Sequence, residues 1–415
     1  MSKHSMKHNY NSIFSVLAKL FELGKSFLLI LIAGRYLDVT QFGVFSLLIS
    51  ISAIIGIVAE FRLQEIIFRN IKSQHDITKV VGNTFVISLV FSIFGFFIIT
   101  FIGSLDYTGN YDFIYMLYGL NFIFNSTRVI KFSLIAKGFS IQVIVIELIS
   151  LVTVSFYFYL NIFGVSYDVL SFVKVKLIDT AIISTLILSL YFKIYGFSLV
   201  IYKVDVKAYF NGSLPLVFSG IAVLLYQKLD VIVIKWYLGF EQLGIYVANY
   251  SLVSIFSLVP VVICQMYSGD LHTNNGESPM KYMKKMNLVG FLFSFIYLIL
   301  AYPLGDFIYS GKYNLDYYYY MFFSIIPLIS AVGASSTQIM IAKNIHKKVW
   351  IKSILSLLLN LLLNVVLVQN LGLFGCLLAT VISLIIANYF MNYLMNDYKD
   401  IFRIQTRSFI YDRKK

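Results

Sequence analysis

The chain has 415 residues, of which 59% are apolar and only 13% are charged, and its formal net charge is +13. A soluble domain needs about 25% charged residues to cover its surface, so this composition and a mean hydropathy of +0.82 exclude an ordinary soluble protein. They predict many membrane spans of roughly 20 apolar residues each. The basic residues lie in short segments between apolar runs, which indicates membrane topology and argues against a nucleic-acid-binding face.

Apolar runs separated by polar breaks predict twelve membrane-spanning helices. In chain order the runs cover 13–34, 43–61, 80–102, 111–130, 141–163, 169–192, 213–236, 243–267, 287–306, 317–341, 350–369 and 373–395. The fourth run is the least regular, because Arg128 and Lys131 interrupt its end. We therefore expect an all-α polytopic membrane protein with two six-helix bundles, an N-terminal half (1–208) and a C-terminal half (209–415).

Basic residues are distributed unevenly between the two sides of this layout. If the N-terminus is inside, only Arg35, Lys235 and Lys312 fall in outside segments, whereas inside segments hold most of the other lysines and arginines. This imbalance predicts that both termini are cytoplasmic. The first apolar run carries charges and shows no small-residue cleavage site, so we expect a retained helix rather than a signal peptide.

A short internal repeat relates the two halves. Tyr36-Leu37 and Gln41-Phe42-Gly43-Val44-Phe45 match Tyr237-Leu238 and Gln242-Leu243-Gly244-Ile245-Tyr246, with an offset of 201 residues between Tyr36 and Tyr237. Both copies join the first and second span of their half. Six spans per half bring both halves into the membrane from the same side, which predicts parallel repeats with a site between them.

Charged side chains lie inside several predicted spans, although a charge at the bilayer centre costs about 3 kcal/mol. In the first span, Lys19 and Glu22 fall within a narrow helical stripe, and Lys25 lies at its edge. In the seventh span, Asp230 lies on one face and Lys228 on another. We expect these groups to mark a transport path. The alternative is that a Lys–Glu pair only links helices.

Other polar residues of the spans receive different interpretations. Asn360 and Asn364 belong to a polar stripe of the eleventh span, which suits sugar hydroxyls or, equally, interhelical hydrogen bonds. Glu147 lies near the predicted cytoplasmic end of the fifth span, so we expect a solvated side chain. Glu60 is expected at the membrane interface. The sixth span carries Lys174, Lys176 and Asp179.

No catalytic or metal-binding motif is evident. Gly24-Lys25-Ser26 resembles the end of a phosphate-binding loop, but the glycine required five residues earlier is Lys19. Cys264 and Cys376 form no CxxC pattern, and the five histidines lack ligand spacing. We therefore expect no enzyme activity, no metal and no cofactor, with energy from an ion gradient of H+ or Na+ or, alternatively, from a substrate gradient. The candidate coupling groups are Glu22, Glu147, Asp179 and Asp230.

Three segments carry a family resemblance. They are Ala33-Gly34-Arg35-Tyr36-Leu37 with Gln41-Phe42-Gly43-Val44-Phe45-Ser46; Pro215, Tyr226-Gln227-Lys228-Leu229-Asp230, Leu238-Gly239 and Gly244-Ile245-Tyr246; and Leu371-Gly372, Gly375 and Ala379-Thr380. With this layout over nearly the whole chain, the sequence resembles the O-antigen flippases, the polysaccharide-transport branch of the multidrug/oligosaccharidyl-lipid/polysaccharide superfamily.

The resemblance implies two bundles around a cationic cavity that opens to one side of a bacterial inner membrane at a time. The implied substrate is an undecaprenyl-pyrophosphate-linked oligosaccharide, an O-antigen or capsule repeat unit, moved from the cytoplasmic to the periplasmic leaflet. The implied partners are this glycan, the lipid bilayer and the polysaccharide polymerase machinery, with no nucleic acid. The substrate-binding candidates are Lys19, Glu22, Lys25, Lys228, Asp230, Asn360 and Asn364, with Arg128 and Lys131 at the cytoplasmic mouth.

Three alternatives stay open. Cation-coupled multidrug antiporters of the same superfamily usually show an acid and a proline in the first span, and here that span has no proline. The lipid II flippase usually has about fourteen spans, more than this length readily supplies. A non-transporting membrane scaffold is the alternative of a different class, and the intramembrane charges and the repeat weigh against it.

Overall fold

A computed structural model of the chain describes residues 18, 21–22, 24–72, 77–105, 111–162, 167–196, 201, 203–272, 278–343, 345 and 348–409. Nearly all of these residues are helical, and none of them forms a strand. The predicted all-α fold class is therefore confirmed. The chain clusters into two compact units, which we call unit 1 (Met1–Leu37 and Leu48–Leu224) and unit 2 (Asp38–Leu47 and Leu225–Lys415). The predicted halves, 1–208 and 209–415, stay a prediction.

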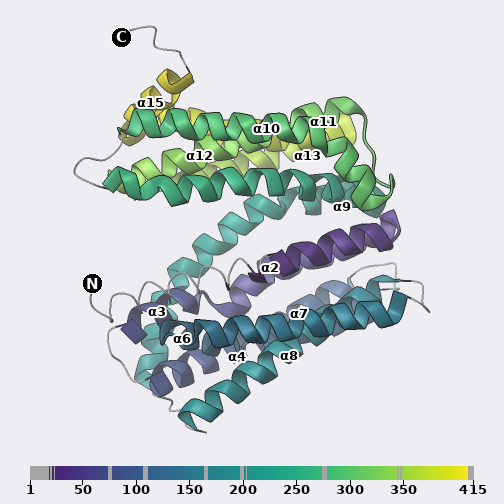
Figure 1. Cartoon of the computed structure of the whole chain (residues 1–415), viewed down its shortest axis with the longest axis vertical. Coiled ribbons are helices and arrows are strands. Elements are labelled where there is room, and N and C mark those ends of the chain that lie inside the picture. Colours follow the sequence, from purple (N-terminus) through teal and green to yellow (C-terminus); the bar gives the residue numbers. More distant parts are fainter. Residues whose placement is uncertain are drawn as a thin grey trace. The chain divides into compact units, whose positions relative to one another are not determined.

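Unit 1 is a bundle of long apolar helices. It contains a helix over residues 24–36, most of α2 (Val39–Glu60), α3 (Leu63–Lys72), α4 (Ile77–Ser104), α5 (Asp112–Asn125), α6 (Arg128–Ala136), α7 (Ser140–Ile162) and α8 (Val169–Tyr195). Helix α5 packs between α4 and α8. Helix α7 packs on α8, and α3 packs on α6 (Figure 1). Buried aliphatic side chains such as Val80, Ile130 and Leu134 fill the core.

Unit 2 continues the same architecture. It contains the C-terminal part of α9 (Lys203–Met266), then α10 (Pro279–Tyr309), α11 (Tyr317–Phe323), α12 (Ile325–Ala342), α13 (Val349–Ile385), a π-helical turn (Ile386–Phe390), α14 (Met391–Leu394) and α15 (Lys399–Phe409). Helix α12 packs against both α10 and α13, and α15 covers the ends of α10 and α12 (Figure 1). The border between the two units falls inside α9.

Eight helices among the described residues are long and apolar enough to cross a membrane. Two of them are interrupted by a single glycine with positive φ, Gly239 in α9 and Gly372 in α13, so each divides into two arms. The irregular fourth run forms α5 and α6, which are separated at Ser126 and Thr127, directly before Arg128. The chain is thus a multi-pass membrane protein. The count of twelve spans and the cytoplasmic termini stay predictions.

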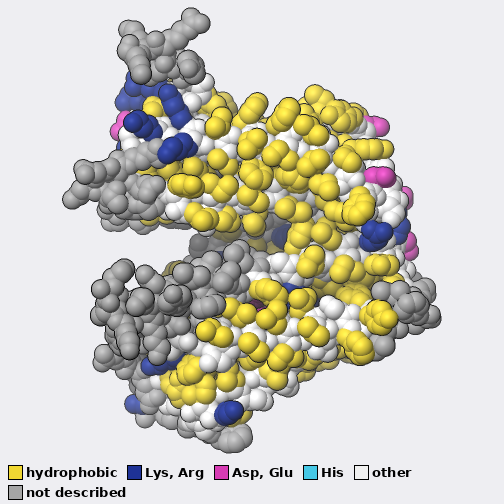
Figure 2. Space-filling view, in the orientation of Figure 1, with side chains coloured by type: hydrophobic (Ala, Val, Ile, Leu, Met, Phe, Trp, Pro, Cys, Tyr) yellow, Lys and Arg dark blue, Asp and Glu magenta, His cyan; other side chains and the backbone are white. Residues whose placement is uncertain are grey.

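The surface of both units agrees with a lipid environment. Figure 2 shows hydrophobic side chains over most of the visible face. Large apolar residues such as Phe97, Phe156, Leu288 and Leu362 are exposed on the long helices. Soluble monomers rarely expose apolar patches larger than a few hundred Å², so these faces fit contact with lipid tails rather than water.

The two copies of the predicted repeat contact each other at a close helix crossing within unit 2. A Cβ atom added to Gly43 would clash with the carbonyl oxygen of Phe240, and one added to Gly244 would clash with that of Val39. These contacts are reciprocal, because Val39 and Phe240 are separated by the same 201 residues as Gly43 and Gly244. Glycine at both positions lets the two backbones approach closely, as small residues do at helix contacts in membranes.

This crossing predicts that Gly43→Ala or Gly244→Ala destabilises the protein. Each added methyl group meets backbone rather than a flexible side chain, and such overpacking costs about 1–3 kcal/mol. The measurement is the thermal unfolding midpoint of the purified protein in detergent. Gly56→Ala in α2 is the matched control, because its nearest neighbour would be a ring carbon of Phe122 at 3.8 Å. Equal midpoints for Gly43→Ala and Gly56→Ala would contradict the steric argument.

Candidate functional site

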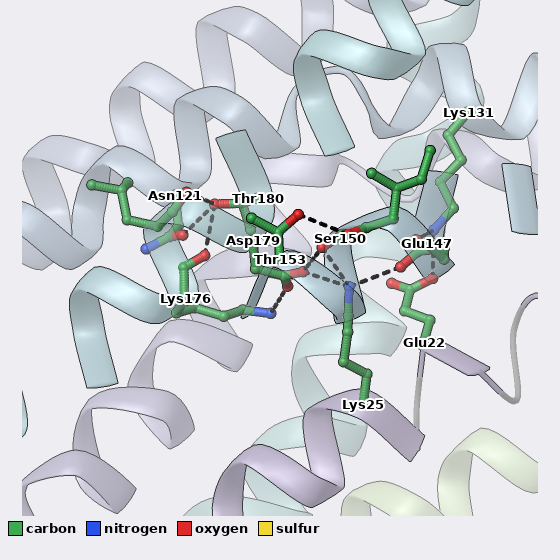
Figure 3. A network of polar contacts seen from close by, with 12 residues as sticks. Glu22, Lys25, Asn121, Lys131, Glu147, Ser150, Thr153, Lys176, Asp179 and Thr180 are labelled. Atoms are coloured by element: carbon green, nitrogen blue, oxygen red, sulfur yellow. Dashed lines mark hydrogen bonds and ion pairs between the residues drawn. The ribbon is translucent and has the colours of Figure 1, made fainter. Parts of the chain in front are cut away.

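A continuous chain of ion pairs lies inside unit 1, and Figure 3 shows its central part. Acids and bases alternate along it in the order Glu60, Arg128, Glu22, Lys131, Glu147, Lys25, Asp179 and Lys176. These eight groups balance to zero net charge and come from helix 24–36 and its preceding turn, α2, α6, α7 and α8. These ion pairs therefore link five segments of unit 1.

The centre of the chain is deeply buried. The Lys25 ammonium lies 2.8 Å from Glu147 Oε2 and 2.5 Å from Asp179 Oδ1. The Lys131 ammonium lies 2.6 Å from Glu147 Oε1. The Ser150 hydroxyl donates to Asp179 and accepts from Lys25 at 3.4 Å. Each central charge thus has two opposite partners, which is the condition under which buried ions can be tolerated in an apolar interior.

The two ends of the chain differ. At one end, Arg128 pairs with both Glu22 and Glu60, and Lys131 reaches the other oxygen of Glu22 at 2.9 Å. At the other end, the ion pair of Lys176 with Asp179 has the longer distance of 3.4 Å, and the Lys176 side chain is 23% exposed. The Lys176 end is therefore the less neutralised of the two.

Local structure explains how these groups converge. The break at Ser126 and Thr127 starts α6 at Arg128. Arg128 and Lys131 then lie one turn apart on the same face of α6. Lys131 is buried in this position, so the charges that made the fourth run irregular serve the interior of unit 1.

The prediction that Glu147 is solvated was wrong. Its side chain is only 1% exposed, because α7 begins at Ser140 and places Glu147 two turns inside the helix, against Lys25 and Lys131. Closeness to the end of an apolar run does not show which face of a helix turns inward. Glu60 was expected at the membrane interface, and in the structure it pairs with Arg128.

A pocket with about 470 Å³ of empty space borders the ion-pair chain. All members of the chain except Glu60 line it, together with polar residues such as Ser26, Asn125 and Thr127. A pocket with both signs of charge and several hydroxyl and amide groups can hold water, sugar hydroxyls or an anionic group. We refer to it as the charged pocket.

Unit 2 contains a second buried polar cluster, centred on Asp230. The carboxylate accepts hydrogen bonds from Tyr246 at 2.8 Å, Thr380 at 2.7 Å and Asn364 at 3.1 Å. Asn364 in turn contacts the side chain of Asn360 at 3.1 Å. The groups that donate these hydrogen bonds to Asp230 are all neutral, and Lys228 attracts the carboxylate electrostatically from a longer distance.

The two clusters fall on helices that the predicted repeat relates. In unit 1, Lys25 of helix 24–36 contacts Asp179 of α8. In unit 2, Asp230 of α9 contacts Thr380 of α13. Asp179 and Thr380 are themselves separated by 201 residues, the repeat offset. The basic member belongs to the first helix in one half, and the acidic member belongs to the first helix in the other.

The structure sorts the predicted site residues into these two groups. It brings Glu22, Lys25, Arg128 and Lys131 together in unit 1, and Asp230, Asn360 and Asn364 together in unit 2. Lys228 is half-buried next to the Asp230 cluster on α9 and interacts electrostatically with Asp230. Lys19 lies outside the described residues.

Sequence reasoning missed other members of the clusters. Lys176, Tyr246 and Thr380 were not candidates, and Asp179 was considered only for coupling. A signal for Lys176 and Asp179 was present, because an acid three residues after a base inside one apolar helix fits an ion pair. Tyr246 and Thr380 had no such signal, since hydroxyl residues are ordinary in membrane helices.

Comparisons with known proteins agree with this architecture. A sequence model described as polysaccharide biosynthesis protein matches residues 10–267. The lipid II flippase MurJ in its inward closed conformation is 14% identical, with a TM-score of 0.69 over 95% of this chain and 90% of that one. An inward-facing multidrug resistance MATE family transporter of the MOP superfamily is 15% identical, with a TM-score of 0.66 over 94% and 96%.

A third structure belongs to a MOP superfamily transporter from Pyrococcus furiosus, which is 13% identical with a TM-score of 0.54 over 96% of each chain. At such identities these similarities establish a shared fold. No curated protein sequence matches this chain.

The ion-pair chain predicts that Glu147→Ala is strongly destabilising. The substitution removes a buried partner from both Lys25 and Lys131, and breaking a buried pair costs on the order of 3 kcal/mol. The measurement is unfolding in detergent followed by circular dichroism. Glu65→Ala is the control, because Glu65 is exposed and pairs with Arg62 at 3.9 Å; loss of such a surface pair costs at most about 1 kcal/mol. Similar losses for both variants would show that the buried pairing contributes little.

Proposed function

Because this chain belongs to the polysaccharide biosynthesis protein family, we propose that it is a flippase for a lipid-linked glycan. The proposed substrate is an undecaprenyl-pyrophosphate-linked oligosaccharide, an O-antigen or capsule repeat unit. Alternating access carries it from the cytoplasmic to the periplasmic leaflet of the bacterial inner membrane. The proposed partners are this glycan, the bilayer and the polysaccharide polymerase machinery, and transport involves no enzymatic step.

The observation that carries this proposal is the charged interior of an otherwise apolar, multi-pass unit. Eight ionisable groups line up inside unit 1 next to a pocket with hydroxyl and amide groups. Ionisable residues inside membrane segments are costly and mark substrate or ion pathways by default. A pyrophosphate-linked sugar needs both cations and hydrogen-bonding groups. The fold shared with a lipid II flippase supports a lipid-linked substrate.

Lys25 and Lys228, the two lysines proposed to bind the pyrophosphate, differ in how far nearby carboxylates neutralise them. Lys25 is neutralised by Glu147 and Asp179, so a phosphate must compete with these carboxylates for it. Lys228 interacts with one carboxylate, that of Asp230, and only through longer-range attraction. We therefore assign the first contact with the pyrophosphate to Lys228, and a later, competitive contact to Lys25.

The coupling ion is assigned to Asp230. Its carboxylate is buried among neutral hydroxyl and amide groups, and the Oδ1 atom of Asn364 beside it is buried without a hydrogen-bond partner. A buried carboxylate whose hydrogen-bonding partners are all neutral is stabilised by binding a proton or a cation. The other candidates, Glu22, Glu147 and Asp179, already have basic partners. H+ or Na+ at Asp230 is thus the proposed driving ion.

A surface-polymer assay tests the flippase function. In cells that lack the native protein and carry this one at matched membrane levels, Lys25→Ala and Lys228→Ala should abolish surface polymer and accumulate its lipid-linked precursor. Lys→Arg at the same positions should retain part of the activity, because the charge survives while the geometry changes.

Lys193→Ala is the control for this assay, since Lys193 is exposed at the end of α8. It should display polymer normally. Normal display from both alanine variants of Lys25 and Lys228 would refute their role. Absence of precursor accumulation in cells without any functional copy would refute the flippase itself.

Proteoliposomes containing the labelled lipid-linked glycan test the coupling. The unmodified protein should respond to an imposed Na+ gradient or to an imposed pH gradient, and Asp230→Asn should abolish that response because a neutral amide cannot exchange a proton or balance a cation. Asp400→Asn on exposed α15 is the control and should behave as the unmodified protein. A response of Asp230→Asn equal to that of the control would exclude Asp230 as the coupling group.

A further inference from the structure

A second pocket of unit 1 shares a wall with the charged pocket. It has about 530 Å³ of empty space, part of which is open to the surroundings. Lys25, Ser26, Lys176 and Asp179 line both pockets. The remaining lining of the second pocket is almost entirely apolar, and we refer to it as the apolar pocket.

The apolar lining comes from single faces of two neighbouring helices. On helix 24–36 it continues from Lys25 through Leu28 and Ile32, at helical spacing. On α7 it continues through Leu151, Val154 and Phe158, likewise one face of the helix. On both helices these residues follow the member of the ion-pair chain, Lys25 or Glu147. The pocket is therefore charged at one end and apolar along the rest.

Among the cations at this charged end, Lys176 has the weakest pairing with carboxylates and is therefore best able to bind a further anion. Lys25 and Lys131 each contact two carboxylates within 2.9 Å. Lys176 contacts one carboxylate, at 3.4 Å, and keeps part of its side chain exposed. In Figure 3 its ammonium group extends toward Asp179, at the opposite end of the cluster from Glu22 and Lys131.

We propose that the apolar pocket binds the polyprenyl diphosphate carrier of the substrate, with a phosphate on Lys176 and the first isoprenoid units between helix 24–36 and α7. This inference rests on the proposed flippase function and names the part of the protein that holds the lipid. A lipid with an anionic head and a hydrocarbon chain matches a pocket with a cation at one end and aliphatic walls along the other.

The two parts of the pocket contribute differently. Lipid tails are as apolar as leucine side chains, so the chain gains little by moving from the bilayer into the pocket. The phosphate gains a charge-assisted contact in surroundings of low dielectric constant. Lys176 therefore supplies the affinity, and the apolar walls set the position of the head group beside the ion-pair chain.

Binding of defined probes to the full-length protein in detergent tests the inference. The probes are farnesyl diphosphate, inorganic pyrophosphate and dioleoylphosphatidylglycerol, measured by titration calorimetry. Lys176→Ala should weaken farnesyl diphosphate at least about tenfold, the effect of losing one charge-assisted contact. Lys174→Ala is the matched control, because Lys174 is exposed on the same helix and lines neither pocket. It should bind within about twofold of the unmodified protein, the scatter expected for a surface change.

Filling the apolar pocket tests its role. Val154→Trp should weaken farnesyl diphosphate and leave pyrophosphate unchanged, whereas Val152→Trp on the exposed face of α7 should change neither. Val154→Phe, a smaller change, should give a partial effect if the tryptophan variant fails to fold. Lys176→Arg should retain binding, because the positive charge is kept.

Several outcomes would overturn the inference. These are unchanged binding of farnesyl diphosphate by Lys176→Ala, and insensitivity of that binding to both Val154→Phe and Val154→Trp. Equal competition by dioleoylphosphatidylglycerol would assign the pocket to a bilayer phospholipid instead of the carrier. If the binding results hold but cells without a functional copy accumulate no lipid-linked precursor, the flippase function fails while a prenyl diphosphate site remains.

Discussion

The arrangement of unit 1 depends on one constraint, that charges inside an apolar bundle need partners of opposite sign. Lys25 lies in the helix that begins the bundle, and its ammonium is compensated by Glu147 of α7 and Asp179 of α8. Leaving any of these groups unpaired would cost several kcal/mol in such surroundings. The pairing therefore specifies which helices must touch. Apolar packing alone specifies this weakly, because lipid tails are as apolar as leucine side chains and provide no hydrophobic force between helices.

The two units solve the same problem in opposite ways. In unit 1 the buried acids are balanced by bases, whereas Asp230 of unit 2 is surrounded by hydroxyl and amide groups. Asp179 and Thr380 share the offset of the predicted repeat, whereas their partners Lys25 and Asp230 are 205 residues apart. A balanced ion-pair chain changes state only by exchanging partners. A lone carboxylate changes state by taking up a proton or a cation, so the two halves are suited to different tasks in transport.

The sequence predicted the helices well because span length and hydropathy are local properties. It predicted that Arg128 and Lys131 disturb a span, but it could not show that the helix restarts at Arg128 and turns both inward. After the predicted seventh and eleventh spans the sequence predicted loops, but in the structure the helix is interrupted at single glycines, Gly239 and Gly372. Their positive φ allows a break within one residue. Pairings such as that of Lys25 with Asp179 join residues 154 apart. No local pattern encodes them, and this is also why Glu147 was misplaced.

The order of charges has a consequence for how a ligand acts in the proposed flippase. Every interior acid of the chain is shared between two bases, so a phosphate that takes Lys176 from Asp179 leaves Asp179 to Lys25 alone. Asp179 and Glu147 then compete for Lys25 on unequal terms, and the shift passes through Lys131 to Glu22 and Arg128. The last member, Glu60, ends α2, the helix whose first turns belong to unit 2. In the proposed flippase, a change of partner at the Lys176 end can thus alter the pairing of Glu60 at the end of α2.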